Sequence, residues 1–196
     1  MVRVVITGPE SCGKTTLVKA LAAHFGVGFV SEYAREYLEK MLTNTGLENI
    51  KTSPLYNEFD LGQMLIGQMQ QEVNILDKML KRNLLQLMIC DTDALTFKIW
   101  HEEVFQTKDR QFIKNSEKHI ITMRDDKNVT NVYLLCSPEG IEWQPDPLRE
   151  NPNDRKRLFD IYQKNLVFYN QSYFILRGSK EKRLAEAIKI VNRLMK

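Results

Sequence analysis

The sequence predicts an α/β protein with a parallel sheet that is covered by helices on both faces. Two observations support this fold class. The chain opens with a β-branched, apolar run from Val2 to Thr7, which is followed by a glycine-rich loop and then by a helical pattern. Further short apolar runs alternate with helical patterns along the rest of the chain. Because strands that alternate with helices pair in parallel, we expect a sheet that is buried on both sides.

The first half of the chain carries three helical patterns, of which the last is long. Ser31 can cap the N-terminus of a helix that begins at Glu32. In order, we expect a helix at 14–25, a strand at 27–30, the helix from Glu32, a polar loop at 43–54 and a helix at 57–82. One face of that last helix is expected to carry Leu61, Met64, Leu65, Gln68, Met69 and Val73.

The second half of the chain continues the alternation. A strand at 87–90 stops abruptly at Asp91-Thr92-Asp93, and a strand at 132–136 is followed by a proline-rich loop. Helices are expected at 94–104, 109–123 and 154–169, and the last strand at 173–176 turns through Arg177-Gly178-Ser179 into a final helix. That helix keeps Leu184, Ile188, Val191 and Leu194 or Met195 on one apolar stripe.

Composition describes an ordinary globular protein. The 196 residues suit a single domain, 43% of them are hydrophobic and 27% are charged. The formal net charge of +3 comes from dispersed basic residues, so we expect no nucleic-acid partner. The apolar runs are only strand-length and the first strand starts at residue 2, so we expect neither a membrane span nor a signal peptide. Cys12, Cys90 and Cys136 stand singly, which favours a reducing cytoplasm.

The loop after the first strand carries the clearest chemistry. Residues 8–16 fit the pattern G-x-x-x-x-G-K-[ST], between a strand and a helix as that pattern requires. Backbone N–H groups of such a loop turn inward on phosphate, and the helix dipole favours negative charge at the same place. Lys14 would reach the β- and γ-phosphates and Thr15 would ligate Mg²⁺. We expect ATP to contact Gly8, Pro9, Glu10, Ser11, Cys12, Gly13, Lys14, Thr15, Thr16 and also Gly178.

Carboxylates follow two other strands, at the sheet edge where ligands bind. Asp91 is expected to hold Mg²⁺ opposite Thr15, although Asp91 or Asp93 could instead cap the next helix. Glu32 and Arg35 share a helix face with Glu36. They form either a surface salt-bridge ladder or an acceptor pocket, in which a carboxylate takes a proton and Arg35 holds ribose or phosphate.

Three further features have two interpretations each. The basic residues Arg149, Arg155, Lys156 and Arg157 form either a solvated helix face or a lid over the γ-phosphate, within a lid region at about 138–169. Tyr33 and Trp143 either pack in the core or form a flat wall for the acceptor's ring. Cys12 is either a small core filler or a reactive thiol whose pKa the helix dipole lowers.

The motifs together resemble the NadR-type nicotinamide riboside kinase domain, a phosphate-loop kinase group. The resemblance rests on Gly-Pro-Glu-Ser-x-Gly-Lys-Thr-Thr from Gly8, Glu-Tyr-x-Arg-Glu from Glu32, Asp-Thr-Asp from Asp91, and Glu142-Trp143 with Asp146-Pro147-Leu148-Arg149. It covers essentially the whole chain. It implies a three-layer fold with a parallel five-stranded sheet of order 2-3-1-4-5, and transfer of the γ-phosphate of ATP-Mg²⁺ to the ribose 5′-hydroxyl of nicotinamide riboside.

The resemblance also implies roles for single residues. Lys14 and Thr15 hold phosphate and metal, and Asp91 holds the metal. Glu32 or Asp93 is the catalytic base. Tyr33 and Arg35 line the acceptor pocket, together with Glu32, Asp93 and Trp143, and Arg149 belongs to the lid.

Other functions remain open on the sequence. A nucleotide-dependent switch without a small acceptor is one alternative, but the guanine-reading Asn-Lys-x-Asp pattern is missing because Thr107-Lys108-Asp109 has its acid one place early. A ring-forming AAA-type ATPase is disfavoured because the chain has no room for a separate helical lid domain. A kinase for another nucleoside, such as thymidine, would share the mechanism and differ in its acceptor.

Overall fold

A parallel sheet forms the centre of the protein. The computed structural model describes residues 1–45, 56–82, 87–105, 110–145 and 153–196. Within them the sheet has five strands in the order β2-β3-β1-β4-β5, so the predicted fold class and strand order are confirmed. The strands are β1 (Val2–Thr7), β2 (Phe29–Val30), β3 (Leu87–Asp91), β4 (Thr130–Cys136) and β5 (Tyr173–Leu176).

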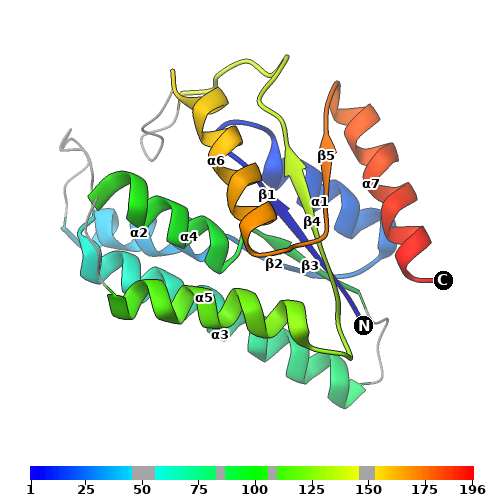
Figure 1. Cartoon of the computed structure of the whole chain (residues 1–196), viewed down its shortest axis with the longest axis horizontal. Helices are drawn as coiled ribbons and strands as arrows, with labels where there is room; N and C mark the ends of the chain where they lie inside the picture. Colours follow the sequence, from blue (N-terminus) through cyan, green and yellow to red (C-terminus); the bar gives the residue numbers. More distant parts are fainter. Residues whose placement is uncertain (46–55, 83–86, 106–109, 146–152) are drawn as a thin grey trace.

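Helices cover both faces of the sheet (Figure 1). They are α1 (Lys14–Phe25), α2 (Tyr33–Thr45), α3 (Glu58–Arg82), α4 (Ala94–Trp100) with a π-helical continuation η1 (His101–Phe105), α5 (Arg110–Asp125), α6 (Arg155–Phe168) and α7 (Lys180–Leu194). Helices α1 and α7 pack on one face, and α2 to α6 pack on the other.

The central strand β1 explains why the two layers form. All of its residues are buried, and successive side chains of a strand point to opposite faces. Val4 and Ile6 belong to the core under α1 and α7, whereas Val5 belongs to the core under α2 to α6. Val4 pairs with Ile89 of β3 and Val132 of β4, which places the carboxyl ends of these strands at one edge.

The second strand and the helix after it differ from expectation. Strand β2 begins at Phe29 rather than residue 27, and α2 begins at Tyr33 and continues to Thr45, into the region expected to be a loop. The Ser31 hydroxyl, expected to cap α2, donates to Gln71 Oε1 of α3 at 3.4 Å. The backbone N–H of Tyr33 instead donates to Gln68 Oε1 of α3 at 2.9 Å, so the cap comes from a helix distant in sequence. The rest of that expected loop, at 46–54, lies outside the described residues.

Helices α3 and α4 also depart in detail. Leu61, Met64 and Leu65 are buried as expected, but Val73 is 50% exposed and does not belong to the core face. The helix expected at 94–104 widens into a π-helical turn at His101. No helix among the residues that the structure describes is long and apolar enough to cross a membrane.

A charged cluster is buried beside the sheet. Arg3 of β1 donates through Nη2 to Glu72 of α3 at 2.7 Å and to Asp93 at 3.1 Å. The Tyr133 hydroxyl donates to the same Asp93 oxygen at 2.6 Å, and His119 of α5 lies 3.4 Å from Glu72. Because every member is almost fully buried, the ion pairs and hydrogen bonds compensate one another's loss of water.

Candidate active site

A cavity of about 470 Å³ lies at the carboxyl edge of the sheet. The whole loop from Gly8 to Thr16 lines it, which is the part of the site predicted from the sequence. From the loop the cavity extends between the start of α2, the end of α4 and the N-terminal half of α6. Its other lining residues include Glu32, Arg35, Leu38, Thr96, Ile99, Trp100, Glu103, Val104, Arg157, Tyr162, Lys180 and Arg183.

The glycines of the loop are required by its backbone. Gly8 has φ 135°, and a Cβ there would lie 2.7 Å from the carbonyl oxygen of Cys136. Gly13 has φ 84° and immediately precedes α1, so the first N–H groups of the helix face the loop. Ser11 also has a positive φ, 52°. This arrangement creates a concave backbone that suits a phosphate group.

Lys14 lies within that concavity. Its Nζ donates to the carbonyl oxygens of Gly8 and Pro9, at 3.0 and 2.9 Å. Burial alone would lower the pKa of Lys14, but the nearby charges of Cys12 and Glu32 outweigh it, and the pKa is raised. The lysine therefore stays cationic at the place where phosphate would bind.

Glu32 precedes the first residue of α2 and faces the loop. Burial raises its pKa above the ordinary value, and Asp91 adds to this effect, while Lys14 and Arg35 oppose it. Arg35 lies one helical turn along and lines the same cavity. Arg35 also lies 3.7 Å from Glu39 in an exposed ion pair, so it takes part in both the ladder and the cavity.

Asp91 and Thr15 lie together, as the expected metal site requires. Burial raises the pKa of Asp91, and a hydrogen bond from Thr15 counteracts that shift. Among the described residues, Asp91 Oδ1 is buried with no hydrogen-bond partner. A carboxylate and a hydroxyl beside a phosphate loop suit Mg²⁺, and the orphaned oxygen offers a ligand position. The same residues contain no cluster of three or more His, Cys, Asp or Glu that would hold a metal alone, so phosphate and water would complete the coordination.

Asp93 lies elsewhere, and this corrects the expectation of a base at the cavity. Its Oδ1 accepts from the Leu95 backbone N–H at the start of α4, and its Oδ2 contacts Arg3 and Tyr133. Thr92, with a φ of 67°, separates Asp93 from Asp91. Asp93 is therefore the helix cap and a member of the buried charge cluster; neither Asp93 nor Asp91 is among the cavity's lining residues, but only Asp91 lies beside Thr15 of the loop.

The two aromatic residues expected in the acceptor pocket are also placed differently. The Tyr33 ring packs so closely on Gly67 of α3 that a Cβ there would lie 2.1 Å from it. Trp143 stacks with the guanidinium of Arg155, 5.8 Å from the ring centroid. Neither residue lines the cavity. Gly178 does not line it either, and its carbonyl accepts from Arg183 while its neighbour Lys180 reaches the cavity.

Sequence reasoning missed the wall opposite the loop. Trp100 and Ile99, near the end of α4, line the cavity with Val104 of η1. Glu103 of η1 forms an ion pair with Arg157 of α6 at 2.6 Å, across the cavity. The sequence did indicate that these residues could lie near the site, because they follow the strand that ends at Asp91. The helical pattern alone did not indicate which face of this segment would turn toward the loop.

The segment after β4 contacts the phosphate loop through Ser11. The Ser11 hydroxyl accepts from the Gln144 backbone N–H at 2.9 Å, and Arg155 Nη1 donates to the carbonyls of Ser11 and Ile141 at 3.3 and 2.9 Å. Arg149, the expected lid cation, lies outside the described residues. Among the other basic residues expected there, Arg157 lines the cavity and Lys156 is exposed.

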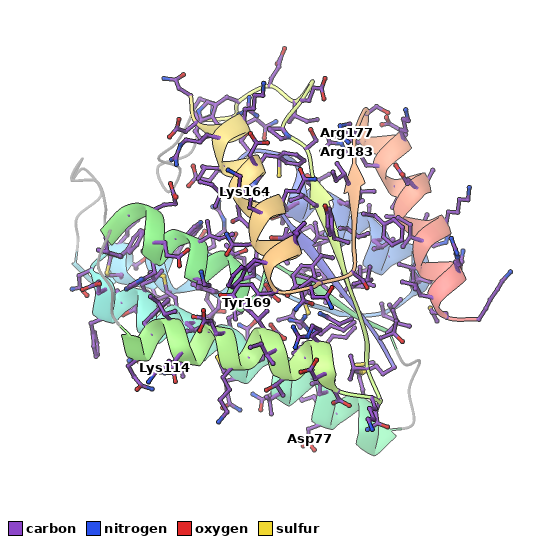
Figure 2. All side chains as sticks on the ribbon, in the orientation of Figure 1. Asp77, Lys114, Lys164, Tyr169, Arg177 and Arg183 are labelled. Carbon is purple, nitrogen blue, oxygen red and sulfur yellow. The ribbon has the colours of Figure 1, made fainter. Side chains whose placement is uncertain are left out.

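Arg183 connects the loop to the end of β4. Its buried guanidinium donates to the carbonyl oxygens of Cys12 at 2.9 Å, Ser137 at 2.7 Å and Gly178 at 2.8 Å. Figure 2 labels Arg183 near the start of α7, close to Arg177. The thiols of Cys12 and Cys136 also interact by a hydrogen bond. Arg183, which also lines the cavity, thus fixes the loop to the segments that follow β4 and β5.

Comparison with known families and sequences gives one match. A family model described as an AAA domain matches residues 3–183. A search of curated proteins gives no match.

Solved structures similar to this chain include NadR proteins and kinases. A NadR protein in complex with NR has a TM-score of 0.68 at 20% identity, over 97% of this chain. A NadR protein in complex with NAD and AMP-PNP has the same TM-score at 23% identity, also over 97% of this chain. The match covers 50% and 48% of those two chains, so this chain spans about half their length.

Two kinases match along nearly their whole length. A deoxyadenosine kinase from M. mycoides has a TM-score of 0.58 at 14% identity, over 97% of this chain and 99% of that one. A thymidylate kinase from Ehrlichia chaffeensis has a TM-score of 0.60 at 16% identity, over 97% of this chain and 98% of that one. The chain therefore has the phosphate-loop fold of nucleoside and nucleotide kinases.

Proposed function

This chain belongs to the AAA domain family, and from that premise we propose that it is an ATP-dependent kinase whose acceptor is nicotinamide riboside and whose product is nicotinamide mononucleotide. The observation that carries the proposal is a single cavity that joins the phosphate loop to Glu32 and to Trp100. Phosphoryl transfer requires the donor and acceptor to lie in line within one site. The likeness to a NadR structure that holds NR supports the choice of acceptor.

The donor side consists of the loop and the residues around Lys14. The loop N–H groups and Lys14 would bind the phosphates of ATP, with the Lys14 ammonium exchanging its bonds to the Gly8 and Pro9 carbonyls for phosphate oxygens. Thr15 and Asp91 would hold Mg²⁺. When bound, this ion neutralises charge on the phosphate oxygens.

The acceptor side begins at Glu32. In the proposed reaction the acceptor hydroxyl oxygen forms a bond to the γ-phosphorus, the bond to the oxygen of the departing ADP breaks, and Glu32 takes the hydroxyl proton. Burial raises its pKa above the ordinary glutamate value, which makes it a stronger proton acceptor than an exposed glutamate. Arg35 would hold the ribose. Asp93 acts as a positioning residue, because it caps α4 and thereby fixes the wall of the cavity.

Trp100 supplies the surface for the acceptor's ring. It lines the cavity with Ile99, Val104 and Leu38, which form an apolar wall. A cationic pyridinium ring gains attraction from an indole face and from the nearby Glu103. In this assignment Trp100 takes the role expected of Tyr33 and Trp143.

The lid and the domain organisation are part of the proposal. We assign residues 138–169 to a lid, with Arg149 and Arg157 as its cations, and residues 1–196 to one kinase domain. The hydrogen bonds from Gln144 and Arg155 to Ser11 support a lid whose position depends on whether phosphate is bound in the loop. The free, buried state of Cys12, Cys90 and Cys136 supports a reducing cytoplasm as the compartment.

A panel of nucleosides and ribosides, incubated with ATP and Mg²⁺ and analysed by mass spectrometry, tests the proposal. We expect phosphorylated nicotinamide riboside as the main product. Lys14→Ala should lower kcat by about a hundredfold or more, because a charge contact to the transferring phosphate is lost. Lys189→Ala, an exposed lysine on α7, is the matched control and should retain full activity.

Two results would contradict the proposal. Full activity of Lys14→Ala would remove the loop from the reaction. ATP hydrolysis without phosphorylation of any nucleoside would favour the switch or ATPase function instead. Phosphorylation of a different nucleoside would leave the proposed mechanism in place and change only the identity of the acceptor.

A further inference from the structure

An ion pair connects two walls of the cavity. Glu103 Oε2 lies 2.6 Å from Nη1 of Arg157, which belongs to α6. Both residues line the cavity, and the Glu103 side chain is only 25% exposed. Helix α6 packs beside α4, which η1 continues (Figure 1). The pair therefore joins α6 to the α4–η1 side of the cavity, which we call the acceptor wall.

Glu103 is the charged residue of the acceptor wall. The other described residues of α4 and η1 that line the cavity are Thr96, Ile99, Trp100 and Val104, none of which carries a charge. Glu103 follows Trp100 by three positions, a spacing that places two side chains on one face of a helix. A flat cation on the indole ring would therefore lie next to a carboxylate, whereas a neutral ring would gain the stacking contact alone.

Arg157 is also held by a second carboxylate, from its other edge. Its Nε and Nη2 donate to Oδ2 of Asp154, at 3.0 and 2.9 Å. If Arg157 left Glu103, its guanidinium would stay anchored at the start of α6 while Nη1 turned to another acceptor. Lys14 and the phosphate loop line the same cavity, and a guanidinium suits the oxygens of a phosphate group.

Binding of a cationic acceptor would place two cations beside one carboxylate. In the empty cavity Arg157 neutralises Glu103. A pyridinium ring on Trp100 adds a second positive charge, which repels Arg157 and attracts Glu103. The γ-phosphate of ATP offers Arg157 a partner with more charge and more acceptor oxygens than one carboxylate. After an exchange each cation would have its own anion, so no charge in the cavity would be left unpaired.

We propose that Glu103 selects a cationic acceptor by exchanging Arg157 for the acceptor's pyridinium ring, and that the released Nη1 of Arg157 binds the γ-phosphate. A neutral nucleoside leaves Arg157 on Glu103, so the phosphate lacks this cation. The inference rests on the proposed function for the places of the ring and the phosphate. It adds to that function a residue that determines specificity and a reason why Arg157 engages the phosphate only when the correct acceptor is bound.

Nicotinamide riboside and its neutral dihydro form are matched probes, because they share the ribose and the carboxamide and differ in the charge of the ring. In titration calorimetry without ATP, the wild type should bind the cation at least about tenfold more tightly. Glu103→Gln should lower this ratio about fivefold, the upper end for a partly exposed ion pair. Glu102→Gln is the matched control and should keep the wild-type ratio, because Glu102 pairs with Lys98 and does not line the cavity.

Variants of Arg157 test the exchange itself. Arg157→Gln should tighten binding of the cation about threefold, because Glu103 no longer has to leave a partner. The same variant should lower kcat about a hundredfold, because the phosphate loses a charged donor. Binding and turnover thus change in opposite directions, which general damage to the fold would not produce. In a Glu103→Gln background, Arg157→Gln should no longer affect binding of the cation.

Equal affinity of the wild type for the two ring forms would overturn the inference, as would an unchanged ratio in Glu103→Gln. Tighter binding in Arg157→Gln that persists in the double variant would indicate a long-range effect of charge and would exclude the exchange. Turnover decides the proposed function separately. A wild type that phosphorylates nicotinamide riboside without preferring the cation keeps the function and loses the inference. Preference for the cation without any phosphorylation removes the function and keeps Glu103 as the residue that selects the cation.

Discussion

The Asp93 carboxylate lies 3.1 Å from the Arg3 guanidinium, in a part of the core where both side chains are almost completely buried. Arg3 also holds Glu72 at 2.7 Å. The charge of Asp93 is thus balanced by a cation from β1, and we therefore expect Asp93 not to act as the proton acceptor. This contact connects the start of α4, and so the wall of the cavity, to the central strand.

Asp93→Asn should therefore lower the stability of the fold rather than remove a catalytic base. The substitution weakens the charge-assisted hydrogen bonds that Arg3 and Tyr133 donate to Asp93 inside the core, and we expect the free energy of unfolding to fall by roughly 3 kcal/mol. Urea denaturation at neutral pH measures this change. Glu36→Gln, which breaks the exposed pair with Lys40, is the control and should leave stability essentially unchanged because solvent screens that pair. A large loss of kcat with unchanged stability would return Asp93 to the role of base.

Glu32→Gln should change the pH dependence of the reaction. The pKa of Glu32 is raised mainly by burial, so the base is protonated at low pH and kcat should rise with pH until the carboxylate is fully ionised. The Gln variant should lose about a hundredfold in kcat and lose this acidic limb, with little change in ATP affinity. A pH–rate profile that keeps the same limb in Glu32→Gln would exclude Glu32 as the base.

The same shift predicts the sign of an effect on stability. A carboxyl whose folded-state pKa is raised binds its proton more tightly in the folded protein than in the unfolded chain. Stability is therefore lost as pH rises from the ordinary glutamate pKa through the raised one. At neutral pH and without nucleotide, Glu32→Gln should raise Tm, and a lowered Tm would contradict the cause that we assign.

Trp100 and Trp143 provide a matched pair for the acceptor wall. Trp100→Ala should raise the riboside KM about tenfold through lost ring contact, with ATP KM unchanged. Trp143→Ala should leave the riboside KM near the wild-type value, because Trp143 stacks on Arg155 outside the cavity lining. Steady-state kinetics with each substrate varied separately measures both. The reverse order of effects would restore Trp143 to the acceptor site.

Cys12 should react as a thiolate at neutral pH. Burial alone would raise its pKa, but the hydrogen bond from Cys136 and the charges of Lys14 and Arg183 lower it from 9.0 to about 7. Alkylation by iodoacetamide, followed by mass spectrometry, should therefore accelerate with pH up to about 7, block ATP binding, and be slowed by ATP-Mg²⁺.

One variant and one internal control test the cause of this reactivity. Cys136→Ala should slow the alkylation of Cys12 at neutral pH, because it removes the hydrogen-bond donor to the thiolate. Cys90, whose pKa burial raises well above 9.0, should stay unmodified in the folded protein. Modification of Cys12 without loss of ATP affinity would show that its side chain only fills space.

The sequence by itself determined the parts of this protein that depend on local backbone geometry. The run Val2–Thr7, the glycines at 8 and 13 and the helix Lys14–Phe25 required only neighbouring residues, and all three were confirmed. The alternation of strands and helices predicted a parallel sheet, because short crossovers and buried strands leave few other arrangements. The resemblance supplied the strand order, which the structure confirmed.

Only the tertiary structure decided which distant residues the side chains of the site contact. Asp91 and Asp93 are two residues apart in one motif, yet Asp91 lies beside Thr15 and Asp93 beside Arg3, a partner 90 positions away in sequence. Trp100 lines the cavity from the last position of α4, directly before the π-helical turn that begins at His101. Such partners depend on how elements that are distant in sequence pack together. A buried charge is tolerated only where an opposite charge from another element packs beside it.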